Sequence, residues 1–344
     1  MPAVEHDDQT GGPAPGTRVR LLLDPGPDLL AGVDALLDRS VAEDAAPPLN
    51  EAALLALKHP DRGDVRHLVA VAETEPVGYA QLASDGTGQL VVDPGARRRG
   101  VGRLLMESLL DVARHQQVQL RVWALGDSPA AQALAARTGL VATRTLLVMQ
   151  RPLSDLPAPV VPDGVTIAPF RVGVDEQAWL RVNARAFAHH PEQGSIDAED
   201  LAERMGEAWF DPAGFFLARG SASASERNPA GGVGGRPPSG QGTQQAPLLG
   251  FHWTKEHGTQ PNGEVLGEVY VLGVDPDAQG RGLAKALLLT GLAHLRDRGD
   301  SVVELYVEAD QAVPVGLYRS YDFTEASRDV MYAGPATGST PATV

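Results

Sequence analysis

The same strand–turn–helix pattern occurs twice in this chain, and this repeat is the feature that most constrains its fold. Asp275-Pro276 follows Asp93-Pro94 by 275 − 93 = 182 residues. Around each copy, the hydrophobic pattern predicts one order of elements: a strand, two helices, three strands, a helix, a strand, a helix and a strand. The chain is therefore predicted to fold as two tandem α/β (α+β) domains. The next polar residue and glycine keep the same offset, as Arg97 with Gln279 and Gly100 with Gly282.

Changes in composition suggest where the domains begin and end. The first domain is expected at 17–152 and the second at 164–335, joined by a Pro-rich linker at 153–163. Ser, Gly, Pro and Gln dominate 220–246, which is predicted to be a disordered insertion in a hairpin of the second domain. Residues 1–16 are predicted to be a disordered tail, and 336–344 a second tail.

The overall composition excludes several classes of function. Lys plus Arg is 29 and Asp plus Glu is 44, so the formal charge is 29 − 44 = −15, which argues against a nucleic-acid or anionic-membrane partner. The chain has no cysteine, which excludes disulfides, thiolate metal sites and a cysteine nucleophile. No apolar run approaches the roughly 20 residues of a membrane span. We expect a cytoplasmic protein that is a monomer.

The repeated turn has the properties of an anion site. In the second copy an apolar strand ends at Asp275-Pro276, and Gln279-Gly280-Arg281-Gly282-Leu283-Ala284 leads into a helix. The first turn of a helix has unpaired N–H groups and a favourable dipole for anions. Small residues at Gly280, Gly282 and Ala284 allow a phosphate to approach the backbone. The structural alternative is an ordinary strand-to-helix turn.

The spacing Gln-x-x-Gly-x-Ala resembles the pyrophosphate-binding signature of the GCN5-related N-acetyltransferases. This resemblance implies that each domain has a mixed, mostly antiparallel sheet flanked by helices. It also implies acetyl-CoA as co-substrate, with no metal.

The two copies differ at two positions where this chemistry needs acid and base groups. Glu268 corresponds to Gly86, and Tyr318 corresponds to Ala135. An amine must lose a proton before it attacks a thioester, and the leaving thiolate benefits from a proton donor. We therefore expect the second domain to be catalytic and the first to bind cofactor or only support the structure. The structural alternatives are a solvated strand residue for Glu268 and a core-packed helix residue for Tyr318.

Longer stretches of the second half resemble the mycothiol synthases, a family of tandem acetyltransferases that acetylate the cysteinyl amine of Cys-GlcN-Ins. The matching stretches include His190-Pro-Glu-Gln-Gly194, Leu249-Gly-Phe-His-Trp-Thr-Lys255 and Gly267-Glu-Val-Tyr-Val-Leu-Gly-Val-Asp-Pro276. The resemblance implies that Glu268 is the general base and Tyr318 the general acid. It places the substrate, a small thiol glycoside, at Glu51, Glu192, Lys255, Glu268 and Tyr306. The structural alternative is a solvated loop charge for Glu192 and Lys255, an ordinary strand aromatic for Tyr306, and a helix N-terminal carboxylate for Glu51.

The same resemblance assigns acetyl-CoA contacts in both halves. In the second half they are Leu272, Gly273, Val274, Gln279, Gly280, Arg281, Gly282, Leu283, Ala284, Lys285, Gln311, Ala312, Val313, Pro314, Val315 and Gly316. In the first half they are Leu90, Val91, Val92, Arg98, Arg99, Gly100, Val101, Gly102 and Arg103, and a solvated basic patch is the alternative for Arg97 to Arg99. The family usually has Asn-x-x-Ala where this chain has Gln311-Ala-Val-Pro314, so the last helix is predicted to begin near Ala312.

Two other functions remain compatible with the sequence. The first is the same acetyl transfer to another amine, such as a peptide N-terminus. The second is a non-catalytic acetyl-CoA-binding regulatory module, which would fit the first half alone. Glu268 and Tyr318 argue against this second function for the whole chain.

Overall fold

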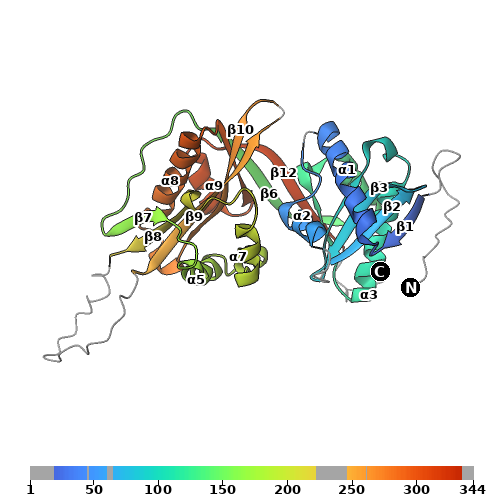
Figure 1. Cartoon of the computed structure of the whole chain (residues 1–344), viewed down its shortest axis with the longest axis horizontal. Coiled ribbons are helices and arrows are strands. Elements are labelled where there is room, and N and C mark those ends of the chain that lie inside the picture. The colour runs from blue at the N-terminus through green and yellow to red at the C-terminus, as the bar shows by residue number, and fades with distance from the viewer. Residues whose placement is uncertain (1–18, 45, 60–64, 222–245, 261, 335–344) are drawn as a thin grey trace, which may run out of the picture. The chain divides into compact units, whose positions relative to one another are not determined.

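A computed structural model describes residues 19–44, 46–59, 65–221, 246–260 and 262–334 (Figure 1). The described residues form two compact units. Unit 1 takes them from Met1–Leu147, Glu308–Gln311 and Ser327–Val344, and unit 2 from Val148–Val307 and Ala312–Ala326. The predicted tails and residues 222–245 of the predicted insertion lie outside the described residues.

The first half of the chain supplies most of unit 1. Its elements are β1 (Val19–Leu23), α1 (Pro27–Asp44), α2 (Glu51–Lys58), β2 (Val65–Ala72), β3 (Glu75–Ala83), β4 (Thr87–Val92), η2 (Pro94–Ala96), α3 (Val101–Gln116), β5 (Arg121–Ala124), η3 (Leu125–Asp127), α4 (Pro129–Arg137) and β6 (Val141–Pro152).

The second half repeats this order and supplies most of unit 2. Its elements are β7 (Val165–Pro169), α5 (Glu176–Ala186), α6 (Pro191–Gly194), α7 (Ala198–Met205), η4 (Pro212–Gly214), β8 (Phe215–Gly220), β9 (Leu248–Thr259), β10 (Val265–Val274), η6 (Pro276–Ala278), α8 (Leu283–Arg298), β11 (Val302–Glu308), α9 (Ala312–Arg319) and β12 (Thr324–Ala333).

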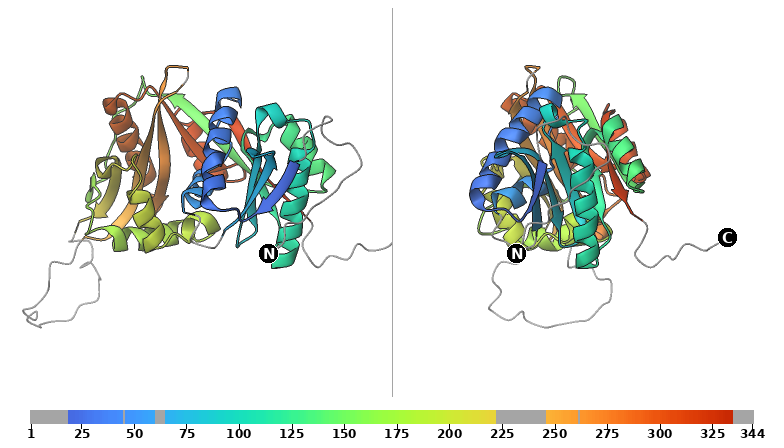
Figure 2. Two further views of the ribbon diagram at one scale, coloured as in Figure 1. Left: turned by 45° about the vertical axis from the view of Figure 1, so that its right-hand side comes forward. Right: turned by 90° about the vertical axis from the view of Figure 1, so that its right-hand side faces the viewer.

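Helices cover both faces of the sheet in unit 1, with α1 and α3 on opposite sides (Figure 2). Successive strand residues point to opposite faces. Leu68 and Ala70 of β2 therefore pack with α3, whereas Val69 and Val71 pack with α1 and α2. Each face buries its own apolar cluster, which explains why these strands are apolar throughout.

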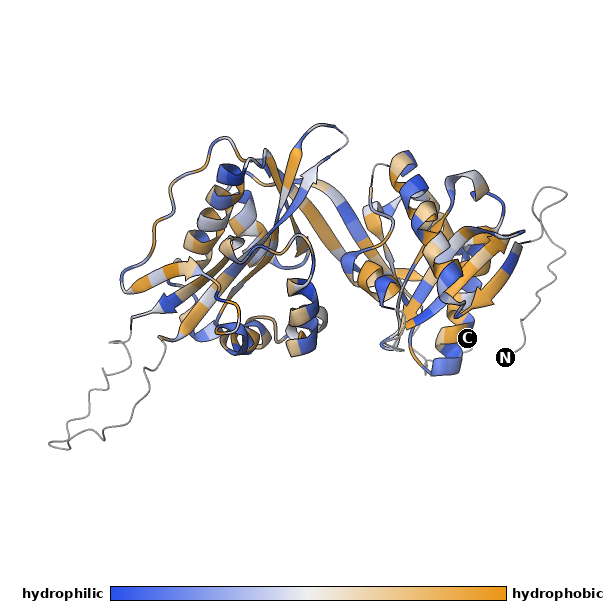
Figure 3. Cartoon of the chain, in the orientation of Figure 1, coloured by the Kyte–Doolittle hydropathy of each residue, from blue (hydrophilic) through white to orange (hydrophobic). Residues whose placement is uncertain are grey.

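Unit 2 is layered in the same way. Phe215 and Leu217 of β8 join an aromatic cluster with Trp179 of α5, whereas Phe216 and Ala218 pack with the first turns of α8. Apolar residues concentrate on the strands, while the helices alternate between apolar and polar (Figure 3). Here, too, the sheet is buried on both faces.

Each unit has a pair of parallel strands that separate after a short contact. β10 pairs with β11 only from Leu266↔Val302 to Glu268↔Glu304, although β10 continues to Val274. β4 pairs with β5 only at Thr87↔Arg121 and Gly88↔Val122. Beyond these pairs the facing backbone groups have no partner on the neighbouring strand, so each sheet opens into a split that a ligand backbone can line.

The last strand of each half belongs to the other half's sheet. The strand order is β1-β2-β3-β4-β5-β12-β6-β11-β10-β9-β8-β7, in which β12 lies next to β5 of the first half and β6 lies next to β11 of the second. β12 pairs antiparallel with β5 from Val330↔Ala124 to Ala333↔Arg121. The order of elements along the sequence does not reveal this exchange.

Four elements differ from the sequence prediction. The sequence pattern predicts a helix from Ala198 to Trp209. In the structure α7 ends at Met205, because Gly206 caps it and Trp209 then packs against Trp253. The sequence pattern does not predict α6. This short helix begins at Pro191, and the side chain of His190, its N-cap, accepts a hydrogen bond from the Gln193 N–H. β6 and β9 are longer than predicted, since they extend into polar residues that show no alternation. α9 begins at Ala312, which confirms that prediction.

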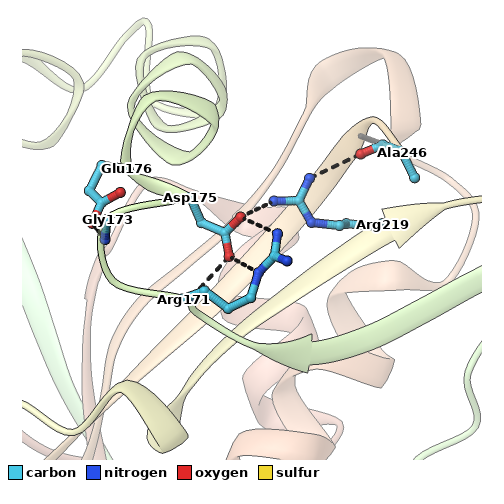
Figure 4. A network of polar contacts seen from close by, with 6 residues as sticks. All are labelled: Arg171, Gly173, Asp175, Glu176, Arg219 and Ala246. Atoms are coloured by element: carbon cyan, nitrogen blue, oxygen red, sulfur yellow. Dashed lines mark hydrogen bonds and ion pairs between the residues drawn. The ribbon is translucent and has the colours of Figure 1, made fainter. Parts of the chain in front are cut away.

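Asp175 connects β7, α5 and β8 in unit 2 (Figure 4). Its buried carboxylate accepts hydrogen bonds from Arg171 at 2.9 Å and from Arg219 at 2.8 Å. Arg219 also donates to the Ala246 carbonyl at 3.0 Å. Burial favours the neutral acid, but the hydrogen bonds and charges of the two arginines prevail and lower the pKa of Asp175.

Candidate active site

Glu268 is the last residue of β10 that pairs with β11. Its Cα is the register partner of Lys255 on β9 and of Glu304 on β11. The side chain is only 9 % exposed. A buried carboxylate at the closed end of the split can reach a reacting group held between the two strands, as a general base must.

Lys255 and Tyr306 come from the strands on either side of Glu268. The Lys255 ammonium lies 4.5 Å from the centroid of the Trp209 ring and 5.2 Å from that of Tyr270, two cation–π contacts. Tyr306 is exposed on β11, two residues after Glu304, with its hydroxyl 3.5 Å from a Glu304 oxygen. The structure therefore places three of the predicted substrate residues, Glu268, Lys255 and Tyr306, on three adjacent strands.

The other two predicted substrate residues are placed differently. Glu51 is the first residue of α2 in unit 1, where Asn50 caps the helix by accepting from Ala53 N–H. Its half-buried carboxylate at a helix N-terminus is also explained by the helix dipole. Glu192 falls within α6, but its side chain lies outside the described residues.

Two titratable residues beside Glu268 were not predicted. His257 Nε2 lies 2.7 Å from Glu268 Oε2 and 3.9 Å from Glu304 Oε1. The Gln150 amide donates to Glu304 Oε2 at 3.0 Å. The available signal was the strand alternation Glu304-x-Tyr306, which places both side chains on one face; the register that brings Glu304 to Glu268 is not visible in the sequence.

The pKa values of these neighbours are shifted. Burial raises the pKa of Glu304, and the negative charge of Glu268 adds to the increase, against the Gln150 hydrogen bond and the charge of His257. For His257, burial lowers the pKa, but the hydrogen bond and charge of Glu268 outweigh burial, so the net shift is upward. The ligand atoms of His257, Glu268 and Glu304 lie within 4.8 Å of one another, a spacing compatible with sharing one cation.

Tyr318 lies on α9, the helix that follows β11. It is 8 % exposed, and its ring packs edge-on against Phe323 with centroids 5.6 Å apart. Burial raises the pKa of its hydroxyl above the ordinary value of 10.0, so it stays protonated at neutral pH. Such a group can donate a proton but cannot serve as a base.

The turn after β10 has the geometry of an anion site. Gly280 and Gly282 have φ of 74° and 81°, in the left-handed region that favours glycine. Gly282 is the N-cap of α8, and the first N–H paired within the helix is that of Ala286, to the Gly282 carbonyl. The N–H groups of Leu283, Ala284 and Lys285 precede it and are the ones that a helix leaves for a ligand.

A pocket of about 530 Å³ lies against this turn in unit 2. Arg281 and Lys285 line it on the helix side, and Pro157 and Val160 of the predicted linker on the other. Tyr321 completes the wall. The pocket thus combines two cations with apolar surface, a combination that suits a phosphorylated aromatic group.

Other predicted cofactor residues fall on the elements around this turn. Leu272, Gly273 and Val274 form the end of β10, beyond its pairing with β11. Gln311 precedes α9, and Ala312 to Gly316 form its first turns, with Val313 85 % exposed and Val315 buried.

Unit 1 has a similar turn, with two differences. Gly100 caps α3 with a φ of 87°, but Arg98 has a φ of 63° at the position of Gly280, a conformation that costs a residue with a side chain about 1–2 kcal/mol. Arg97 donates two hydrogen bonds to Asp44, at 2.7 and 2.6 Å, and is therefore engaged within its own unit. Arg98 and Arg99 are exposed, and Arg103 pairs with Glu107. Leu90 to Val92 end β4, and Val101 and Gly102 open α3.

Within the described residues, no helix has both the length and the apolar character needed to cross a membrane.

Comparison with known proteins identifies the family. The model of the acetyltransferase (GNAT) family matches twice, at residues 36–140 and 181–323. Among solved structures, a tandem GNAT protein from the clavulanic acid biosynthesis pathway has a TM-score of 0.65 at 20 % identity, over 94 % of this chain and 100 % of that one. A GCN5-related N-acetyltransferase from Sphaerobacter thermophilus has a TM-score of 0.60 at 23 % identity, over 93 % and 98 %. These two likenesses establish the fold.

Sequence relatives are closer. A mycothiol acetyltransferase from Thermomonospora curvata is 48 % identical over 89 % of this chain and 94 % of its own length. One from Catenulispora acidiphila is 46 % identical over 88 % and 94 %, and one from Streptomyces avermitilis is 42 % identical over 94 % and 98 %. The chain therefore belongs to the acetyltransferase (GNAT) family and, within it, to the mycothiol acetyltransferases.

Proposed function

We propose that this protein transfers the acetyl group of acetyl-CoA to the cysteinyl amine of Cys-GlcN-Ins, giving mycothiol and CoA. The observation that carries the proposal is the position of Glu268, at one end of the open part of β10, with the glycine turn at the other end. From Glu268 to Val274 the strand spans roughly 20 Å at about 3.3 Å per residue. An extended cofactor arm lying along this stretch brings its thioester to Glu268.

The residues of unit 2 then divide the chemistry. Glu268 takes a proton from the amine, and the nitrogen lone pair forms a bond to the thioester carbonyl carbon. A free N–H of β10 near Leu272 stabilises the oxygen anion of the intermediate. The carbon–sulfur bond breaks, and Tyr318 gives its proton to the departing thiolate. Its high pKa, caused by burial, supports this role because the proton is present throughout the neutral range.

The pocket beside α8 is proposed to take the nucleotide end of acetyl-CoA. The pyrophosphate binds the N–H groups that open α8, as anions do at helix N-termini. Arg281 and Lys285, which line this pocket, are proposed to contact the 3′-phosphate, and the linker prolines to contact the adenine ring. Unit 1 is proposed to be non-catalytic, because Gly86 and Ala135 stand where unit 2 has Glu268 and Tyr318.

The test is turnover by the full chain with acetyl-CoA and a panel of amines that includes Cys-GlcN-Ins and peptide N-termini. CoA release and the acetylated product are followed by mass spectrometry. Selective acetylation of the cysteinyl amine of Cys-GlcN-Ins is the expected result. Acetylation of a peptide amine alone would keep the chemistry but reject this substrate, and binding of acetyl-CoA without turnover of any amine would reject the catalytic function.

A further inference from the structure

Three titratable side chains meet at the closed end of the β10–β11 split. Glu268 and Glu304 are neighbours in register on parallel strands, and their side chains are 9 % and 11 % exposed. His257 of β9 lies against both, 2.7 Å from Glu268 and 3.9 Å from Glu304, and its side chain is 29 % exposed. The imidazole is therefore the member of the group that solvent reaches most easily.

Two carboxylates this close and this buried repel each other unless a cation lies between them. Lys255, the register partner of Glu268, directs its ammonium over the rings of Trp209 and Tyr270. Asp300, whose carboxyl interacts with the charge of His257, adds negative charge to the region when it is ionised. The site as a whole attracts a cation, and His257 is a partial counter-charge only while it is protonated.

The oxygens of the two glutamates are used differently. His257 Nε2 contacts Oε2 of Glu268, and Oε1 of Glu268 has no hydrogen bond within the described residues. Both oxygens of Glu304 have neighbours: Gln150 donates to Oε2 at 3.0 Å, and the Tyr306 hydroxyl lies 3.5 Å from Oε1. Glu304 is therefore held in place. Its shorter contact is that of Oε2 with Gln150, and its longer contact is that of Oε1, the oxygen nearer His257, with Tyr306.

An acceptor amine reaches this site mainly as an ammonium ion, because a free α-amine has a pKa of about 8. The general base must then bind a cation first and deprotonate it afterwards. A single carboxylate that does both loses its attraction for the substrate when it takes the proton. A second carboxylate beside it can hold the ammonium while the first receives the proton.

We propose that Glu304 binds the ammonium form of the acceptor, and that His257 is a positioning residue that fixes Glu268 through Nε2. This inference rests on the proposed acetyl transfer. The ammonium lies between Glu304 and the free oxygen of Glu268. One N–H proton passes to Glu268, the nitrogen keeps the bonding electron pair, and the neutral amine attacks the thioester carbon. The nitrogen then carries a second proton in excess, and it loses this proton to the phenolate that Tyr318 becomes when it protonates the departing thiolate, so that a neutral amide is left.

The first test is Glu304→Gln, which keeps the size of the side chain and removes its charge. A hydrogen bond to a charged group contributes about 1.5–3 kcal/mol, so KM for the acceptor should rise about 10- to 100-fold. kcat should stay within about threefold, and KM for acetyl-CoA should not change. Glu264→Gln is the matched control, because Glu264 is exposed on the β9–β10 hairpin.

A substrate analogue separates charge recognition from a structural role. The analogue keeps the thiol, the sugar and the inositol of the acceptor but has hydrogen in place of the amine. Glu304→Gln should leave its inhibition constant within about twofold of wild type while weakening the true acceptor. Equal weakening of both ligands, or a loss confined to kcat, would overturn the role of Glu304.

The positioning role of His257 has its own signature. His257→Gln retains an N–H donor near the position of Nε2, whereas His257→Ala removes it. We expect His257→Ala to lower kcat about tenfold or more, and His257→Gln to recover most of this loss, with KM for acetyl-CoA unchanged in both. The acid limb of the kcat profile should move in His257→Gln because Gln cannot titrate. Equal defects in the two variants, or no defect in Ala, would reject the assignment.

Two further experiments separate a failure of the ammonium site from a failure of the proposed function. If the wild-type protein acetylates another amine and not Cys-GlcN-Ins, the substrate proposal fails and Glu304 is tested with that amine. Dialysis against EDTA should leave kcat and both KM values unchanged. A loss of activity that Zn²⁺ restores would assign the three side chains to a metal and overturn the ammonium site.

Discussion

Glu268 and Glu304 are directly opposite each other on parallel strands, and they are the last residues that β10 and β11 pair. Because the pairing stops at these two glutamates, the opening between β10 and β11 has negative charge at its closed end. The glycine turn at the other end of β10 is suited to anions. One strand thus presents opposite electrostatic environments at its two ends, which suits a cofactor with a phosphate head and an amine acceptor.

Replacing Glu268 with Gln should stop proton transfer without disturbing the fold. Loss of a general base typically costs about 10²- to 10⁴-fold in rate, and kcat should fall by this amount. Acetyl-CoA affinity, measured by calorimetry, should remain within about twofold. An equal loss of cofactor affinity would mean that Glu268 supports the split and does not act as the base.

The two helix N-cap glycines provide a matched comparison between the units. Gly282 and Gly100 have φ of 81° and 87°, and a Cβ built on either would meet no atom within 4 Å. Alanine should therefore cost each unit a similar 1–2 kcal/mol of backbone strain. Only Gly282→Ala should raise KM for acetyl-CoA in steady-state assays. A matching kinetic defect in Gly100→Ala would show that unit 1 takes part in turnover.

Tyr318→Phe should keep the ring contact with Phe323 and lose only the hydroxyl. We expect kcat to fall by a smaller factor than in Glu268→Gln, with little change in melting temperature. Because burial raises the pKa of Tyr318, the wild-type rate should show no basic limb from this residue at or below its ordinary value near 10. A wild-type rate and pH profile in the variant would remove Tyr318 from the mechanism.

Asp300 should make stability depend on pH. Its side chain is buried, neither oxygen has a hydrogen-bond partner within the described residues, and burial raises its pKa to about 6. The folded state therefore holds this proton more tightly than the unfolded state, whose pKa is about 3.9. The stability that this proton contributes is complete below about pH 4 and is lost as pH rises through 6.

Asp300→Asn should accordingly stabilise the protein above pH 6 by an amount on the order of 1 kcal/mol. The gain should disappear near pH 4, where the wild-type carboxyl is neutral. Urea denaturation at both pH values measures the difference. A gain independent of pH would point to packing and not to charge.

Asp175→Asn should destabilise unit 2 strongly. Arg219, whose side chain is 14 % exposed, would keep a buried charge without its partner, at a cost of about 3 kcal/mol. Arg171 is 56 % exposed, so Arg171→Ala should cost no more than about 1 kcal/mol. Because the pKa of Asp175 is lowered, its contribution is present above about pH 4 and is lost as pH falls through the folded-state pKa. Denaturant midpoints for the two variants test this order.

The sequence was most informative where local chemistry determines structure. The glycine turn, the repeat and the start of α9 at Ala312 follow from Gly and Pro, which restrict the backbone in ways that can be recognised without a fold. The end of α7 was missed because a helical apolar pattern continues to Trp209, whereas Gly206 and the packing of Trp209 on Trp253 end the helix earlier.

The neighbours of Glu268 depend on register, and register is a property of two strands at once. His257 and Glu304 are 11 and 36 residues from Glu268 along the chain (268 − 257 and 304 − 268). The alternation Glu304-x-Tyr306 is the one local signal, and it shows a shared face but not the proximity to Glu268. The pairing of β6 and β12 with strands of the other half was not predicted for the same reason. The residues of a strand indicate that it is a strand but not which strand it pairs with.

That exchange bears on how such a protein can evolve. After a gene duplication, a copy without Glu268 and Tyr318 equivalents would normally be free to disappear. Here β6, a strand encoded in the first half, is the neighbour of β11, and β12, encoded in the second half, pairs with β5. A deletion of either half would remove a paired strand from the survivor and expose the edge of its neighbour, a risk for aggregation. The strand that each half supplies to the other is thus a reason to retain both halves, whether or not both carry out chemistry.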